Sequence, residues 1–185
     1  MQAAAISSTN VSALTTTQPT ALTATQLARL SSEALVAFDT TQFAALSATQ
    51  VRALTTTQLG NLEAADISEF TTTQIAGLAT TQVRGLTDTA VGALAATQIA
   101  ALTTAQVAAI ETADFAAIQT ADLRALGTAA VAALSTAQLD ALGSAQLGAF
   151  TTTQVAVLTT AQVAALSTDD LNGFGTAQFR AFTTA

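Results

Sequence analysis

Apolar side chains recur along this chain at spacings that alternate between three and five residues. From residue 7 to residue 182 the sequence divides into 22 octads without insertion or deletion. Position 8 of the octad is Leu, Ile or Phe in all 22 units, and position 5 is apolar in 21, with Pro19 as the exception. Position 7 is Ala or Gly in 18 octads, and position 4 is Gln in 14 and Asp in four. Such self-similarity at a fixed period predicts one tandem array.

The average apolar spacing argues against a single long helix. Eight helical residues turn by about 800°, which is about 80° more than two full turns. The apolar side chains of successive octads would therefore drift around a continuous helix by about 80° per octad. Supercoiled helices accommodate apolar repeats of about 3.5 to 3.67 residues, and a mean of about four lies outside that range. A continuous strand would place positions 5 and 8 on opposite faces. A coil built from strands, a β-solenoid, is the alternative, but the wealth of Ala, Gln and Leu favours helix.

We therefore predict an all-α solenoid with one very short helix in each octad. Position 1 is Ser, Thr or Asp in 14 octads and Gly in three, as an N-cap requires. Gln at position 4 then falls at the third helical position, so that S/T-x-x-Q forms a capping box. Position 8 of the preceding octad and position 5 form a hydrophobic staple. One choice of N-cap explains all four positions.

The charged residues indicate the same helix direction. All five arginines lie at position 6 or 7, and ten of the 12 acidic residues lie at positions 1 to 4. The ten are Glu33, Asp39, Glu63, Asp66, Asp88, Glu111, Asp114, Asp122, Asp169 and Asp170. The helix dipole favours acids at the N-terminus and bases at the C-terminus. Position 6, which holds four of the arginines, is predicted to face solvent.

Helices of about six residues do not persist alone in water, so stability must belong to the array. Small residues at position 7 are expected to let neighbouring helices approach closely. Asp39, Glu63, the pair Thr87–Asp88 and Glu111 recur every 24 residues, which indicates three octads per coil, with a two-octad helical hairpin as the alternative.

The predicted organisation has three parts. Residues 1–22 form an irregular N-terminal end, because Pro19 cannot make the helical N–H bond of its position. Residues 23–182 form the regular solenoid, within a repeat register of 7–182. Residues 183–185 begin a further repeat, and we expect the array to be cut from a longer one.

The composition predicts no catalytic site, no cofactor site and no metal site, and therefore no enzyme. His, Cys, Trp, Tyr and Lys are all absent, which removes the common general base, the thiol nucleophile and the soft metal ligands. Two acidic sets, Glu63 with Asp66 and Glu69, and Glu111 with Asp114, have the spacing of a calcium site or a glycosidase pair. Helix capping explains them better, and it also explains Asp169 with Asp170.

The remaining motifs also have structural interpretations. Gly127, Gly143 and Gly175 stand at position 1 and replace the N-cap residue. The eight Phe residues all lie at position 5 or 8, which predicts that they belong to the core. Asn10 begins a weak N-glycosylation sequon.

The net charge of −7 argues against binding to nucleic acid or to an anionic membrane surface. Residues 141–168 are uncharged and long enough to span a bilayer, but Gln and Thr recur throughout them, so no membrane insertion is predicted. No basic and apolar leader follows Met1, so no secretion signal is visible.

The units LTTAQVAAL (158–166) and TTTQIAGLATTQ (71–82) resemble the octad tracts of large bacterial surface and secreted proteins of the adhesin-like class. The resemblance covers nearly the whole chain. It implies an extracellular or cell-surface structural segment, and it carries over no active-site residues.

Three functions are consistent with these patterns. The first is a structural segment of an extracellular fibre, stalk or adhesin, which forms filaments by end-to-end self-association, since the last octad, with Phe179 and Phe182, is as apolar as the interior. The second is a scaffold whose position-6 face binds a protein or glycan. The third is a water- or ice-ordering surface built from Thr ladders at positions 1 to 3, although Asp, Glu and Gly interrupt position 1. The same Ser and Thr hydroxyls are candidate acceptors for O-linked glycans.

Overall fold

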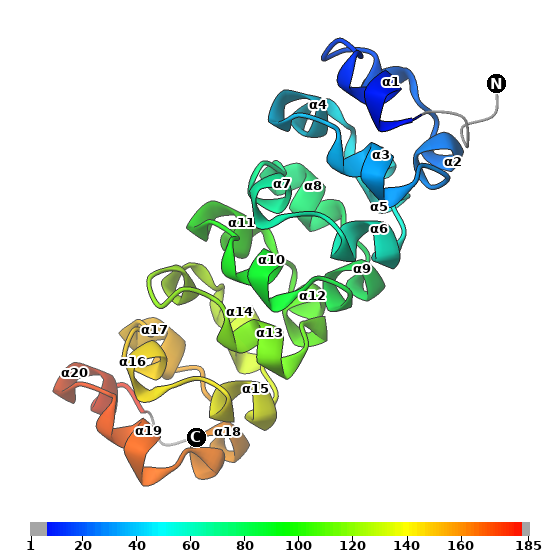
Figure 1. The fold of residues 1–185 in the computed structure, drawn as a ribbon. Helices are drawn as coiled ribbons and strands as arrows, with labels where there is room; N and C mark the ends of the chain where they lie inside the picture. Colours follow the sequence, from blue (N-terminus) through cyan, green and yellow to red (C-terminus); the bar gives the residue numbers. More distant parts are fainter. Residues whose placement is uncertain (1–6, 183–185) are drawn as a thin grey trace.

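The chain forms an elongated array of very short helices, with its first and last octads at opposite ends (Figure 1). The computed structural model describes residues 7–182. Within these residues lie 20 α-helices and two 3-10 helices, one for each octad, and no strand. The predicted all-α solenoid is confirmed, and the β-solenoid alternative is wrong.

The helices follow one another at eight-residue intervals. In chain order they are α1 (Ser8–Ser12), η2 (Pro19–Ala21), α2 (Ala24–Leu27), α3 (Ser32–Val36), α4 (Thr40–Ala45), α5 (Ala48–Arg52), α6 (Thr56–Gly60), α7 (Ala64–Ser68), α8 (Thr72–Gly77), α9 (Thr80–Arg84), α10 (Asp88–Gly92), α11 (Ala96–Ala101), α12 (Thr104–Ala109), α13 (Thr112–Ala116), η3 (Asp122–Ala125), α14 (Thr128–Ala132), α15 (Thr136–Asp140), α16 (Ser144–Leu147), α17 (Thr152–Val155), α18 (Thr160–Ala165), α19 (Thr168–Asn172) and α20 (Thr176–Phe179).

Helix α8 shows how one octad folds. Thr71 is extended, with φ −66° and ψ 157°, and its hydroxyl accepts a hydrogen bond from the backbone N–H of Gln74. The Gln74 side chain in turn accepts from the N–H of Thr71, which completes the predicted capping box. Leu78 is extended again, with φ −60° and ψ 141°, so the next octad starts in a new direction. The extended linkers are the reason that no continuous helix forms.

Two octads depart from this pattern. The octad of residues 15–22 contains the 3-10 helix η2 in place of an α-helix, because Pro19 lacks the N–H that a regular octad uses at position 5. Residues 119–126 form η3, where Gln119 stands at position 1 and no side chain caps the helix. The first octad does form a helix, α1, capped by Ser7. Residues 1–6 and 183–185 lie outside the described residues.

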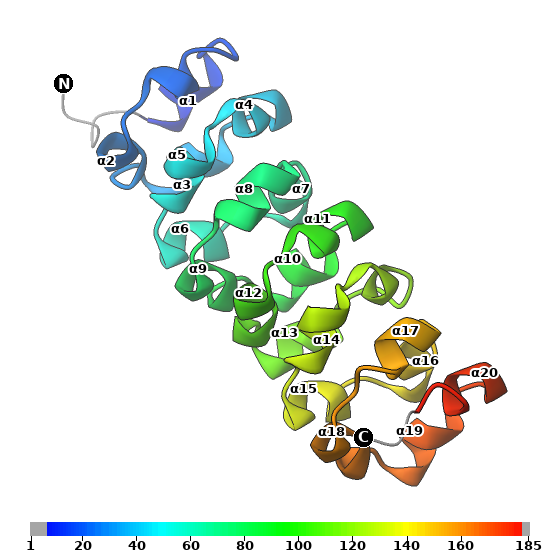
Figure 2. The ribbon, with the colours of Figure 1, turned by 180° about the vertical axis from the view of Figure 1, so that it is seen from behind.

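The helices coil so that each packs on the helices three octads before and after it. Helix α8 contacts α5 and α11, and α10 contacts α7 and α13, as both views show (Figures 1 and 2). The two-octad hairpin is therefore wrong.

Side chains at positions 5 and 8 point inward and form one continuous core, in which Phe43 and Phe115 are wholly buried.

Small residues allow the coils to approach closely. A Cβ atom added to Gly77, at position 7, would lie 3.0 Å from the Cβ atom of Ala48. At Gly173, also at position 7, it would overlap the backbone of Ser144. This confirms the role predicted for position 7.

Position 6 is exposed or half-buried throughout the array. Gly92 shows that this position can also lie close to a neighbouring coil, since a Cβ atom there would be 3.0 Å from the carbonyl oxygen of Ala117.

Candidate functional site

The glutamine at position 4 joins its own octad to the octad four places earlier. The Oε1 atom of Gln74 accepts a hydrogen bond from the Thr71 N–H at 2.7 Å. Its Nε2 atom donates to the carbonyl oxygens of Phe43, at 2.8 Å, and Leu46, at 2.6 Å. The Gln74 side chain is only 2% exposed. Because buried amides need partners for both ends, this arrangement satisfies the whole side chain.

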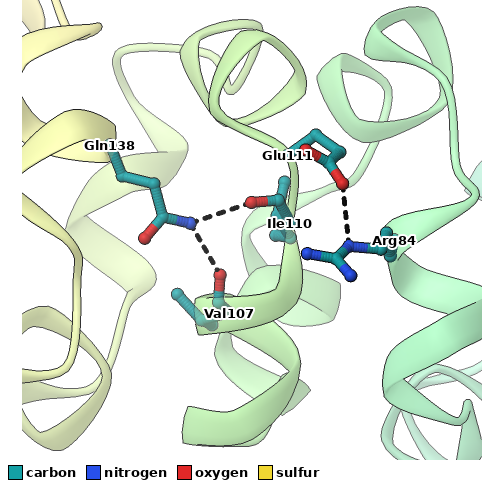
Figure 3. A network of polar contacts seen from close by, with 5 residues as sticks. All are labelled: Arg84, Val107, Ile110, Glu111 and Gln138. Carbon is teal, nitrogen blue, oxygen red and sulfur yellow. Dashed lines mark hydrogen bonds and ion pairs between the residues drawn. The ribbon is translucent and has the colours of Figure 1, made fainter.

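The same bridge recurs along the array. It is made by Gln42, Gln50, Gln58, Gln74, Gln82, Gln98, Gln106, Gln138, Gln146, Gln154, Gln162 and Gln178. Figure 3 shows it for Gln138, whose Nε2 atom donates to the carbonyls of Val107 and Ile110. The other two position-4 glutamines, Gln18 and Gln26, lie in the second and third octads, which have no octad four places earlier within the repeat.

The bridges also set the size of the coil. Most of them span 28 and 31 residues, whereas packed helices lie three octads, or 24 residues, apart. One turn therefore takes between three and four octads. The 24-residue recurrence of acids correctly indicated which helices pack together, but it underestimated the length of a turn.

Sequence analysis assigned position 4 to capping alone and missed the bridge. Glu and Gln are equivalent in a capping box, because only a side-chain acceptor is needed there. Yet position 4 is Gln in 14 octads and Glu in none. A carboxylate has no N–H to donate. The exclusion of Glu was the available signal that position 4 must also donate hydrogen bonds.

All four acids at position 4 lose the bridge, and two of them, Asp66 and Asp170, keep the cap. The Oδ2 atom of Asp66 accepts from the Glu63 N–H at 2.9 Å, as Gln would. Burial raises the pKa of Asp66 above 3.8, and the charge of Glu63 raises that pKa further, against a backbone hydrogen bond that lowers it. Burial likewise raises the pKa of Asp114, with Asp88 and Glu111 adding repulsion.

The acidic sets singled out in the sequence do not form a binding site for a cation. Glu63 and Glu69 are exposed, while Asp66 is turned toward its own helix N-terminus. Asp170 caps in the same way, accepting from the Ser167 N–H at 2.9 Å. No cluster of three or more acids that could hold a metal ion occurs in residues 7–182.

The hydroxyl face of the array divides into two parts. In 12 octads the Ser or Thr hydroxyl at position 1 accepts a hydrogen bond from the backbone N–H of position 4, as at Thr71 and Thr103. These hydroxyls serve as helix N-caps. All position-3 side chains are exposed, and those at position 2 are exposed or half-buried. Position-1 hydroxyls are mostly exposed as well, so the hydroxyls at positions 2 and 3 differ from them in being exposed without serving as N-caps.

The arginines lie on the surface, as predicted for position 6. Arg84 Nε lies 2.8 Å from an Oε atom of Glu111 on the next coil, with the two side chains 69% and 54% exposed (Figure 3). Arg124 Nε donates to the carbonyl of Ala149 at 2.9 Å. Both contacts lie between coils.

The other predicted residues are placed as follows. Gly127, Gly143 and Gly175 are helix N-caps with extended backbones, which confirms that they replace Ser or Thr there. Six of the eight Phe residues are buried, but Phe182 is half-buried and Phe179 is 48% exposed. Asn10 is exposed in α1, where its side chain is hydrogen-bonded to Ser7. No helix within residues 7–182 is long and apolar enough to cross a membrane.

Comparison with known proteins identifies the repeat. Four segments, residues 67–104, 107–139, 115–152 and 139–168, match the family described as the ALTTAQ repeat. Together they cover more than half of the chain. No curated protein and no solved structure matches.

Proposed function

The chain belongs to the ALTTAQ repeat family, and we propose that it is a structural segment that sets length in an extracellular fibre, stalk or adhesin. The observation that carries the proposal is the repetition of one glutamine bridge from Gln42 to Gln178. Because most octads make the same contacts with octads three and four places away, each further octad of this kind extends the array by the same increment. Length is then a property that the number of repeats controls directly.

The surface chemistry supports a position outside the cell. The chain has a net charge of −7 and presents rows of Ser and Thr at positions 2 and 3. These hydroxyls keep an alanine-rich surface hydrated and are candidate acceptors for O-linked glycans. A uniform surface with few charged residues is typical of a spacer that holds another domain away from an anchor.

Electron microscopy and cell labelling test this proposal. An array in which the eight octads of residues 71–134 are duplicated should be longer than the present chain. The gain should be about eight times the length per octad that is measured on the present chain. Antibodies against the array should label intact source cells or their medium. Labelling that requires permeabilised cells would contradict an extracellular role, and a length that does not grow with octad number would contradict a spacer.

A second proposal, end-to-end association into filaments, is favoured by the last described octads. Position-5 side chains are buried in the interior, but Val163 and Leu171 are half-buried and Phe179 is 48% exposed. Described residues cover these side chains only in part, Phe179 being packed on one side by Phe174 and Phe182. At the opposite end, the amides of Gln18 and Gln26 donate to no described carbonyl. By the 28-residue offset, the carbonyls of Leu158, Leu166 and Phe174 have no glutamine donor among the described residues. Apolar surface and these carbonyls at one end thus complement glutamine donors at the other, as head-to-tail stacking requires.

Sedimentation tests the stacking. Phe179→Glu should shift the chain from oligomers to monomers, because it places a charge in the apolar contact. Arg180→Glu, which adds negative charge at the neighbouring exposed position, is the matched control and should leave most of the association intact. Wild-type chain that stays monomeric at high concentration would contradict end-to-end association.

A further inference from the structure

The glutamine bridges are interrupted on three consecutive octads. Position 4 is Asp114 in the octad of α13, Asp122 in that of η3 and Ala130 in that of α14. The other interruptions beyond the fourth octad, at Asp66, Ala90 and Asp170, are single. Because a turn holds between three and four octads, the run removes the bridges around most of one turn.

The carbonyls that these bridges would serve have no donor in the described residues. By the 28-residue offset they are the carbonyls of Leu86, Leu94 and Leu102. The equivalent carbonyls on either side, at Leu78 and Ile110, accept from glutamine Nε2 atoms at 2.8 Å and 3.0 Å. Solvent must replace the missing amide, which weakens the contact between the coils.

Other features of the same joint also weaken it. η3 is a 3-10 helix without a side-chain cap. Asp88, on one coil, repels Asp114, on the next. A surface hollow lies beside the joint, lined by Asp88, Thr89, Gly92, Ala93, Ala117 and Gln119, although Gly92 itself packs closely on Ala117. The single ion pair within residues 7–182, Arg84 with Glu111, crosses this joint, but it is exposed to solvent and contributes little.

Bridges remain at both edges of the interrupted run. Before the run, Gln106 donates to the carbonyls of Ile75 and Leu78. Gln138, in the octad directly after the interrupted three, donates to the carbonyls of Val107 and Ile110 (Figure 3). The helices α9 to α11 therefore have no bridge to the octads four places later, whereas α8 and α12, on either side of them, do. A stretch without bridges between two bridged contacts is where the coils separate most easily.

We propose that this joint, between octads 79–102 and octads 111–134, is a seam at which the array opens first. Opening the seam separates octads 79–102 from octads 111–134 while the bridged coils on either side stay packed. A rod with such a joint bends and extends locally under load while the flanking coils stay folded. The inference rests on the contacts between coils and does not depend on an extracellular location.

Native-state hydrogen exchange, read by NMR at single amides, tests the seam. The position-5 amides of Val91, Ile99, Leu123 and Val131 flank it, and each is hydrogen-bonded inside its own octad. They should exchange through a local opening and faster than Ile75 and Val155, which lie in bridged coils. Similar protection at all six amides would overturn the proposal.

A bridge-restoring variant makes the test specific. Asp114→Gln, Asp122→Gln and Ala130→Gln together should slow exchange at the seam on the order of a hundredfold, since each new bridge slows opening about fivefold. The matched control carries Asp140→Gln, Asp169→Gln and Ala129→Gln, the same changes at exposed positions, and should leave the seam amides unaffected. Equal slowing in both variants, or slowing in neither, would contradict the seam.

Discussion

At the scale of single residues, burial separates positions 5 and 8 of each octad from position 6. Leu102 is 8% exposed at position 8, in mid-array, whereas Arg84 at position 6 is 69% exposed. The first side chain is part of the continuous core, and the second contacts only Glu111 at the surface. Substitution should therefore have very different effects at the two positions.

We expect Leu102→Ala to lower the free energy of unfolding by about 2–5 kcal/mol, since the array cannot collapse around the cavity without shifting whole octads. Arg84→Ala should lower it by less than about 1 kcal/mol, the value of an exposed ion pair. Urea titration followed by circular dichroism measures both. Similar losses in the two variants would mean that the faces are wrongly assigned.

The carboxyl groups should titrate in two classes. Burial first, and neighbouring acids second, raise the pKa of Asp114, so its carboxyl should titrate above 3.8. Hydrogen bonds from Thr41 and Gln42 lower the pKa of Asp39, whose carboxyl should titrate below 3.8. Asp39 thus adds stability that is present above pH 3.8 and is lost as pH falls through its folded pKa. Asp114 destabilises the fold increasingly as pH rises from 3.8 through its folded pKa.

Carbon-13 NMR of labelled aspartate measures these titrations directly. Asp114→Asn should remove the destabilisation at neutral pH, and Asp39→Asn should remove the stabilisation there. A pKa for Asp114 below that of Asp39 would contradict the environments described for the two side chains.

At the scale of the element, local sequence was enough to place almost every helix. Ser, Thr and Asp at position 1, with Gln at position 4, define each N-terminus because both hydrogen bonds of the cap lie within one octad. The same rule shows where helices are weakest. Ala95 stands at the N-cap of α11, where no side-chain oxygen reaches the N–H of Gln98.

Ala95→Thr should therefore stabilise the array by about 1 kcal/mol, because the new hydroxyl would accept the uncapped N–H. Ala96→Thr, one residue later and also exposed, is the control and should have almost no stabilising effect. The midpoint of urea unfolding distinguishes the two variants, provided that the slope of the transition is unchanged. Equal midpoints would show that α11 does not begin at Ala96.

At the scale of the whole molecule, the sequence predicted the solenoid but not how its coils are joined. The partners of the Gln74 amide lie 28 and 31 residues away and are backbone carbonyls, which carry no side-chain signal. Any residue type at positions 43 and 46 presents the same carbonyl. For the same reason the seam at Asp114, Asp122 and Ala130 could not be inferred until the turn was known. Pro19, by contrast, predicted the irregular second octad because its effect is local.

The bridge is the central claim, and one pair of substitutions tests it. Gln98→Glu retains the acceptor for the Ala95 N–H but removes the donor to the carbonyls of Ile67 and Phe70. Gln26→Glu makes the same change where the side chain caps α2 and reaches no earlier octad. Urea unfolding at pH 7 should show a loss of at least about 2 kcal/mol for Gln98→Glu, because a carboxylate is forced against unpaired carbonyls, and of less than about 0.5 kcal/mol for Gln26→Glu. Equal losses in the two variants would contradict the bridge and leave the glutamines as helix caps alone.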